Sequence, residues 1–273
     1  MVIMCRWLAY AGPPIYLESL ILKPEHSLIT QSRDAHQSVT HINADGFGIG
    51  WYGARPEPGV YLDILPAWND ANLRSLAAQI TSPLFFGHVR ATTGTAVTRL
   101  NCHPFSHNRY MFMHNGVIGG FDRVRRALIM AVAPELFPLI QGTTDSEVFF
   151  FLLLSNGLED DPEGAFRRTV ALVLAEMARA GVTERFAMTA ALSDGESILA
   201  LRFASAGIAP SLYYTIGVHP LDALGVKVVD ADQACLIVSE PLDEVTESWQ
   251  EVPPAHMLVA GTGGCAVIPF ELA

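Results

Sequence analysis

A cysteine near the start of the chain is placed to act as a nucleophile with its own base. Cys5 directly follows Met4, and removal of Met4 as an initiator methionine would leave a free α-amino group on Cys5. An α-amine titrates near ~8 and a thiol near ~8.5, so the amine can accept the thiol proton without a histidine. Cys5 is therefore a candidate N-terminal nucleophile. The ordinary alternative is a small buried hydrophobic residue in an apolar strand.

The residues before Cys5 decide whether this base exists. Met1, Val2 and Ile3 precede Met4, and a chain that keeps all four has no free amine on Cys5. Three alternatives stay open: translation starts at Met4, processing removes four residues, or the protein as numbered is inactive.

An Asn-Gly pair can supply the other half of such chemistry. Attack on an amide carbonyl creates an oxyanion, which needs donors already aimed at it. The segment His114-Asn115-Gly116 ends a predicted buried strand, where the Asn115 amide and the Gly116 N–H can point at one spot. Glycine also permits backbone conformations closed to other residues. The alternative is an ordinary Asn-Gly turn.

Two charged residues at the ends of predicted elements are candidates for substrate recognition. Arg90 ends an apolar strand and can bind a carboxylate through two parallel hydrogen bonds. Asp145 begins a predicted helix and can bind a substrate ammonium. The alternatives are an Arg90 paired with a structural aspartate and an Asp145 that only stabilises its helix dipole.

A group of histidines suggests a metal site at first sight. His103, His107 and His114 lie close together in the sequence, near Cys102. Their spacing matches no common site, so we expect hydrogen-bonded structural histidines, no metal and no cofactor.

These residues need a layered framework to meet. Apolar segments predict early strands at 4–11, 47–52, 60–65, 84–91 and 110–114, and later ones at 186–193, 197–203, 212–216 and 234–239, with two more near the C-terminus. Helices are predicted at 69–81, from the capping-box sequence 144–147, and from Asp161-Pro162 to Gly181. Strands, helices and strands again predict one α+β domain over 1–273 with stacked antiparallel sheets. The Gly-rich segment 46–50 is expected to pack strands tightly rather than bind a nucleotide.

Composition narrows the functional class. Apolar residues make up 50% of the chain and charged residues 16%, which is typical of a globular protein. A net charge of −11 argues against nucleic-acid and anionic-membrane binding. The four cysteines form no CxxC pair and suggest no disulfide framework, so we expect a cytoplasmic location. The longest apolar run, 148–154, is too short to span a bilayer.

Taken together, the motifs resemble those of the class II (N-terminal nucleophile) glutamine amidotransferases over most of the chain. The matching segments begin with the Cys5-Arg6-Trp7 opening and continue at 43–48, 88–93, 101–105, 114–116 and 142–147. The chain most resembles the small stand-alone branch, which includes the γ-glutamyl hydrolase of ergothioneine biosynthesis.

The resemblance implies a fold and a set of roles. It implies a four-layer αββα sandwich, the N-terminal nucleophile hydrolase fold, with a thioester on Cys5. It implies an oxyanion hole at Asn115 and Gly116. Its substrate-binding residues would be Arg90 and Thr93 for the glutamyl α-carboxylate and Asp145 for the α-ammonium, with His114 beside them.

Three functions follow from these residues. The first is hydrolysis of a γ-glutamyl amide, which is glutamine or a small γ-glutamyl compound. The second is a glutaminase subunit that supplies ammonia to a separate synthase, and the third is a catalytically silent glutamyl-binding sensor. The expected partners are a small-molecule substrate and either a second copy of the chain, as a homodimer, or a synthase.

Overall fold

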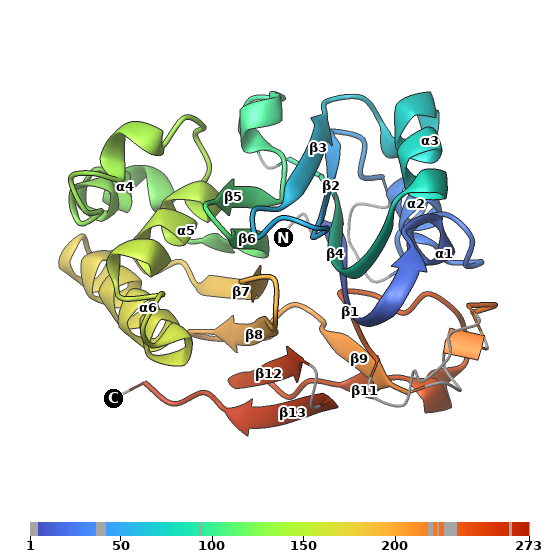
Figure 1. Ribbon diagram of the computed structural model, residues 1–273. Coiled ribbons are helices and arrows are strands. Elements are labelled where there is room, and N and C mark those ends of the chain that lie inside the picture. Colours follow the sequence, from blue (N-terminus) through green and yellow to red (C-terminus); the bar gives the residue numbers. More distant parts are fainter. Residues whose placement is uncertain are drawn as a thin grey trace.

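Two antiparallel β-sheets are stacked face to face, and helices cover both outer faces (Figure 1). The computed structural model describes residues 5–36, 42–92, 94–217, 221–222, 224–226, 234–261 and 264–272 of the chain. The predicted α+β class and its αββα layering are confirmed.

The first sheet carries the start of the chain. Within the described residues its order is β11-β9-β10-β1-β4-β2-β3. Its strands are β1 (Arg6–Tyr16), β2 (Phe47–Trp51), β3 (Gly59–Asp63), β4 (Thr81–Val89), β9 (Tyr213–Ile216), β10 (Cys235–Val238) and β11 (Gln250–Glu251). The helices on its outer face are α1 (Glu18–Ile21), α2 (Leu28–Arg33) and α3 (Ala71–Gln79). β1 lies between β10 and β4, so the residue just before it, Cys5, enters the middle of a sheet.

The second sheet carries the Asn-Gly motif. Its order in the described residues is β13-β12-β8-β7-β6-β5. Its strands are β5 (Phe105–His107), β6 (Tyr110–Ile118), β7 (Phe186–Ser193), β8 (Ile198–Ala204), β12 (His256–Gly261) and β13 (Gly264–Pro269). The helices that cover it are α4 (Phe121–Met130), α5 (Asp145–Ser155) and α6 (Pro162–Arg179).

Helix α5 is buried on most of its surface. Thr144 caps it by accepting a hydrogen bond from the Glu147 N–H across 3.2 Å, as the sequence predicts. Its apolar residues 148–153 are all buried and pack against β6 and α6. A helix enclosed in this way holds the residues at its N-terminus in fixed positions.

The structure differs from the prediction at β1, β6 and α4. β1 does not stop at the turn 12–14; its pairing with β4 shifts register between Ala11 and Ile15, and such an irregularity tolerates prolines. β6 extends four residues beyond the predicted strand 110–114, because β7 pairs with it as far as Ile118. Helix α4 was missed, since only Val124 and Leu128 of its ten residues are buried and its apolar pattern is short.

The glycines at 48 and 50 do pack strands tightly, as expected. A Cβ on Gly48 would lie 2.1 Å from the His103 carbonyl oxygen, and one on Gly50 would lie 2.4 Å from Met111 Sδ. β2 of the first sheet therefore touches the second sheet through its backbone.

None of the helices in the described residues is long and apolar enough to cross a membrane.

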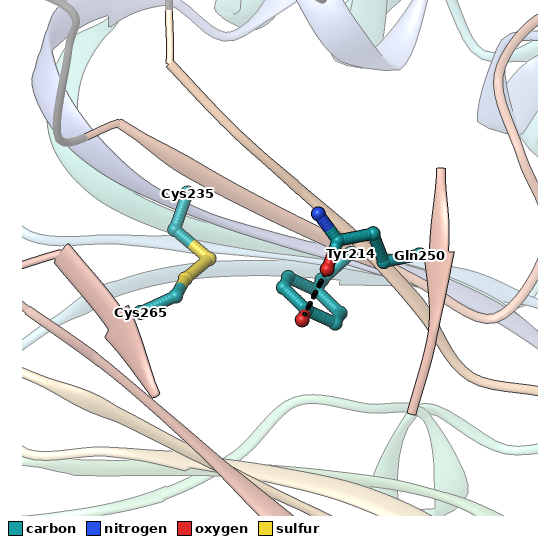
Figure 2. The surroundings of a disulfide bond; sticks show 4 residues. All are labelled: Tyr214, Cys235, Gln250 and Cys265. Atoms are coloured by element: carbon teal, nitrogen blue, oxygen red, sulfur yellow. Dashed lines mark hydrogen bonds between the residues drawn. A yellow bond between two sulfur atoms is a disulfide. The ribbon is translucent and has the colours of Figure 1, made fainter. Parts of the chain in front are cut away.

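A disulfide joins the two sheets. Cys235 of β10 and Cys265 of β13 are bonded, with Cα atoms 6.4 Å apart, and the hydrogen-bonded pair Tyr214 and Gln250 lies in the same region (Figure 2). The prediction of no disulfide is wrong. The two cysteines are 30 residues apart on different sheets, so their spacing in the sequence gave no sign of contact.

Candidate active site

Cys5 directly precedes β1, and its sulfur lies just past the end of β4. The Ala91 N–H donates to Cys5 Sγ across 3.4 Å, and Sγ lies 3.5 Å from the Ala91 carbonyl oxygen. Burial raises the pKa of the Cys5 thiol, and the hydrogen bond from Ala91 and the charge of Arg90 offset only part of the rise. The sulfur is therefore protonated near neutral pH, and attack on an amide needs a nearby base.

A buried ion pair fixes the backbone at Cys5. Arg6 Nε donates to Glu240 Oε2 across 2.7 Å, and both side chains are almost fully buried. Arg6 Nη1 also donates to the Cys5 carbonyl oxygen across 2.8 Å. Removing one partner of such a pair typically costs about 3–5 kcal/mol. This pair was not predicted from the sequence, although a cation inside the apolar segment 5–11 was a signal for it.

Arg90 is buried, and no carboxylate of the described residues pairs with its guanidinium group. Nη1 donates to the Asp45 carbonyl oxygen across 3.2 Å, and Nη2 donates to the hydroxyls of Thr95 and Thr92 across 2.6 and 3.3 Å. The Asp45 carboxylate instead accepts the Thr92 N–H. The alternative of an Arg90 paired with a structural aspartate carboxylate therefore does not hold in the part of the chain described.

Asp145 occupies the first position of α5 and is partly exposed. Its Oδ2 accepts the N–H of Ile118 across 2.8 Å, and its Oδ1 accepts the N–H of Ser146 across 2.8 Å. These bonds hold the carboxylate between the end of β6 and the start of α5. An ionised carboxylate has about four acceptor sites, so capacity for a cationic ligand remains.

His114 is buried beside the Asn-Gly motif. Its Nδ1 lies 2.8 Å from Ser146 Oγ, and a Cβ built on Gly116 would lie 2.8 Å from its Nε2. Burial lowers the pKa of His114, against an opposing effect of Asp145, so the ring is neutral at neutral pH. Ser146, which links His114 to helix α5, was not predicted as a site residue.

Asn115 and Gly116 lie inside β6 rather than in a turn. They pair with Thr189 and Met188 of β7, so the alternative of an Asn-Gly turn is excluded. Gly116 has a φ of 153°, and a Cβ there would lie 2.1 Å from the Ala187 carbonyl oxygen. Only glycine fits this position, which explains its place after Asn115.

These side chains line one small cavity of about 50 Å³. The candidate residues in its wall are Cys5, Arg90, His114, Asn115, Gly116 and Asp145. Cys5 lies just before β1 and Arg90 just after β4, and the others come from β6 and α5, so both sheets contribute. Thr93, the seventh candidate, lies outside the described residues. Further wall residues are Ala91, Thr92, Thr95, His103, Thr144 and Ser146.

The histidines near Cys102 pack as aromatic rings. The rings of His88 and His103 have centroids 4.3 Å apart, and His103 meets Phe105 edge-on at 4.7 Å. Burial lowers the pKa of His88 to about 3 and that of His103 well below its usual range. Neither ring nitrogen of His103 has a hydrogen-bond partner in the described structure, so the expectation of hydrogen-bonded histidines is wrong for this residue. No metal-binding group of three or more His, Cys, Asp or Glu residues occurs among the residues described.

Residues 25–271 match the family model of the class-II glutamine amidotransferases. The chain belongs to this family. The probable glutamine amidotransferase DUG3 of Saccharomyces cerevisiae is 32% identical over 93% of this chain and 81% of its own length. The gamma-glutamyl-hercynylcysteine sulfoxide hydrolase of Mycolicibacterium smegmatis is 26% identical, over 98% of this chain and 100% of its own.

A solved structure agrees with this class II assignment. A glutamine aminotransferase class-II domain protein from Silicibacter pomeroyi matches with a TM-score of 0.74 and 40% identity, over 98% of this chain and 100% of that one. The resemblance drawn from the motifs is confirmed. This class II glutamine amidotransferase is an enzyme of the amidohydrolase type.

Proposed function

We propose that this enzyme hydrolyses a γ-glutamyl amide through a thioester on Cys5. The observation that carries the proposal is a cationic and an anionic side chain in the wall of one cavity that also contains the thiol. Arg90, with no carboxylate bonded to it in the described residues, is available for the substrate α-carboxylate. Asp145 is available for the α-ammonium. A free amino-acid end is the chemical group that satisfies both.

Two further residues complete the proposed binding site. Thr93, from the sequence motif, shares the α-carboxylate with Arg90. His114 presents its neutral Nε2 beside Gly116, where the reacting carbonyl of the substrate would lie.

The first half-reaction forms the thioester. The Cys5 α-amine, once Cys5 is residue one, takes the thiol proton, and the sulfur attacks the γ-carbonyl carbon. The Asn115 side-chain amide and the Gly116 N–H donate to the resulting oxyanion. The C–N bond then breaks as the α-ammonium returns the proton to the leaving amine.

The second half-reaction releases glutamate. Water attacks the thioester carbonyl, the α-amine takes a proton from that water, and the sulfur leaves and recovers the proton. A free amine is needed in both steps. Residues 1–4 lie outside the described part of the chain, so the mature N-terminus stays a prediction.

The relatives support the choice of substrate class. The relative from Mycolicibacterium smegmatis is named for the hydrolysis of a γ-glutamyl compound, and it matches over nearly the whole of both chains. We therefore propose a small γ-glutamyl compound, with glutamine itself as the simplest member of the class.

Organisation and partners are proposals as well. We propose a single catalytic domain over 1–273 that acts alone. The cytoplasmic location stays a prediction from the sequence, and the Cys235–Cys265 disulfide removes the argument from the cysteines on which it rested. A homodimer or a separate synthase partner stays a prediction from the sequence, and sedimentation of the purified chain tests the first.

The test compares γ-linked with α-linked glutamyl amides. The two classes contain the same atoms and differ only in which carbonyl carries the amide. We expect glutamate release from the γ-linked amides only, and none from a Cys5→Ala variant. Turnover only after addition of a synthase would favour the glutaminase subunit, and glutamate binding without turnover would favour the sensor. Equal cleavage by Cys5→Ala would contradict the proposal.

A further inference from the structure

Asn101 joins two segments that are far apart in the sequence. It is fully buried, and its Nδ2 donates to the Ala96 carbonyl oxygen across 2.9 Å and to Thr143 Oγ1 across 3.1 Å. Its Oδ1 accepts the Thr143 N–H across 2.9 Å. One side chain therefore ties the segment after Arg90 to the segment before α5.

Glu147 also binds the segment before α5, through the backbone N–H groups of two of its residues. Its two carboxylate oxygens accept the N–H of Gln141 across 2.9 Å and that of Gly142 across 2.7 Å. The capping-box sequence predicts a bond back to the Thr144 N–H, and the carboxylate is used for these two earlier residues instead. Glu147 is 4% exposed and stands two residues after Asp145 on α5.

Gly142 shows how closely these groups approach. A Cβ on it would lie 2.6 Å from Asn101 Oδ1, 2.6 Å from the Leu100 carbonyl oxygen and 2.8 Å from Glu147 Oε2. No other residue fits without moving one of the three. Backbone and buried polar atoms around Gly142 are therefore in close contact, and we call this contact the junction.

The junction continues to the Arg90 side of the cavity. Thr95 precedes Ala96, whose carbonyl oxygen Asn101 holds, and the Thr95 hydroxyl accepts the short 2.6 Å bond from Arg90 Nη2. A chain of contacts thus leads from Arg90 through Thr95, Asn101 and the 141–143 segment to Glu147. It ends on the helix whose first residue is Asp145.

We propose that Asn101 and Glu147 are positioning residues that fix the distance between Arg90 and Asp145. They would thereby set the preference for substrates with both an α-carboxylate and an α-ammonium. The inference rests on the proposed function, because it assigns those two groups to Arg90 and Asp145. Neither Asn101 nor Glu147 touches the substrate in this scheme.

A change in the distance between Arg90 and Asp145 should alter the substrate specificity and not the rate alone. A substrate with both groups must match two fixed charges at once. A substrate with one group can shift to suit the remaining charge. A misplacement of about 1 Å can cost up to about 100-fold in rate, and this loss falls on the doubly anchored substrate.

The first arm of the experiment measures kcat/KM for three amides on one preparation. They are glutamine, glutaric acid monoamide, which lacks the ammonium, and 4-aminobutanamide, which lacks the carboxylate. We expect Asn101→Ala and Glu147→Gln to lower the preference for glutamine over both analogues by at least about tenfold. A ratio taken on one preparation does not depend on the fraction that is folded.

A matched control removes a similar bond elsewhere. Asn156 Nδ2 donates to Thr169 Oγ1 across 2.9 Å at the far end of α5. Asn156→Ala should leave both preferences unchanged. Unchanged preferences in Asn101→Ala and Glu147→Gln as well would overturn the inference.

The second arm measures hydrogen exchange and does not depend on turnover. The Thr95 N–H donates to Thr92 Oγ1 across 3.1 Å on the Arg90 side. We expect Glu147→Gln to speed its exchange, although the hydrogen bonds of the Glu147 carboxylate in the described residues are made to residues 141 and 142 and not to Thr95. Exchange at Thr95 as slow as in the parent would overturn the inference. If the parent cleaves no γ-glutamyl amide, the proposed function fails, and this arm still decides whether the connection exists.

Discussion

Cys5 and the disulfide lie toward opposite ends of the segment in which β1 pairs with β10. Cys5 precedes the first residue of the strand, whereas Cys235 pairs with Ala11, six residues after Cys5 and on the order of 20 Å along an extended chain. At the first end the sulfur is free and is surrounded by charged and polar side chains. At the second end the sulfur is locked in a covalent link to β13.

This difference indicates that catalysis and stability depend on different parts of the fold. The site end buries Arg6, Glu240, Arg90 and Asn115, and buried polar groups of this kind are costly unless each is paired. The bridged end is tied by a bond whose stabilising effect does not depend on those groups. We therefore expect changes at the site end to alter rates, and changes at the bridged end to alter unfolding.

The largest effect is expected from Asn115→Ala. An oxyanion donor acts on charge that exists only in the transition state, so kcat should fall by about 10²–10³ while substrate affinity stays nearly intact. Steady-state kinetics and a melting curve on the same preparation check this. A kcat within a few-fold of the parent would remove Asn115 from the oxyanion hole.

The bridged end should show the opposite behaviour. The disulfide closes a loop of 30 residues, and in the chain-entropy model such a link contributes about 3–4 kcal/mol to the free energy of unfolding. Cys265→Ser should lose about that amount in urea unfolding and keep the parent kcat. A large loss of kcat in the folded variant would show that the two ends are coupled.

Arg90→Lys tests the charge at the substrate end. Lysine keeps the charge and loses the bidentate geometry of the guanidinium. The fall in kcat/KM should therefore correspond to a loss of about 2–3 kcal/mol of transition-state stabilisation. Selection against amides that lack the α-carboxylate should weaken as well. Unfolding without a kinetic change in the folded fraction would assign Arg90 a structural role only.

The smallest effect concerns the acidity of Cys5. Burial raises its pKa, so alkylation of the chain that retains residues 1–4 should increase only above the ~8.5 of a free thiol. Arg90 stabilises the thiolate, and Arg90→Gln should therefore raise this pKa further. Arg33→Gln, a change at the outer helix α2, is the matched control and should leave it unchanged. A fall in the pKa of Cys5 in the Arg90→Gln variant would contradict the stabilising effect of Arg90 on the thiolate.

Local signals in the sequence predicted most of the fold. Apolar segments such as Phe186–Ser193 matched their strands, and Asp161-Pro162 and Gly181 bracketed α6. These features succeed because turn, cap and strand preferences act over a few residues. The exception at Asn115-Gly116 shows the limit, because pairing with β7 overrides the turn preference of that dipeptide.

The parts of the site that were missed depend on contacts between distant residues. Arg6 and Glu240 are separated by 234 positions, and Asn101 and Thr143 by 42. Each is formed only when separate strands or segments meet in the fold. Motif resemblance placed Cys5, Arg90 and Asp145 in one site, but it contained no information on what holds them in place.

The central claim, that Cys5 acts as an N-terminal nucleophile, is tested most directly by intact mass and activity measured on the same molecules. Two preparations suffice, one expressed from Met4 and one in which residues 1–4 are retained. We predict γ-glutamyl hydrolysis only in molecules whose mass begins at Cys5, because only these have an α-amine beside the thiol. Full activity in molecules whose mass still includes Met1–Met4 would contradict the account.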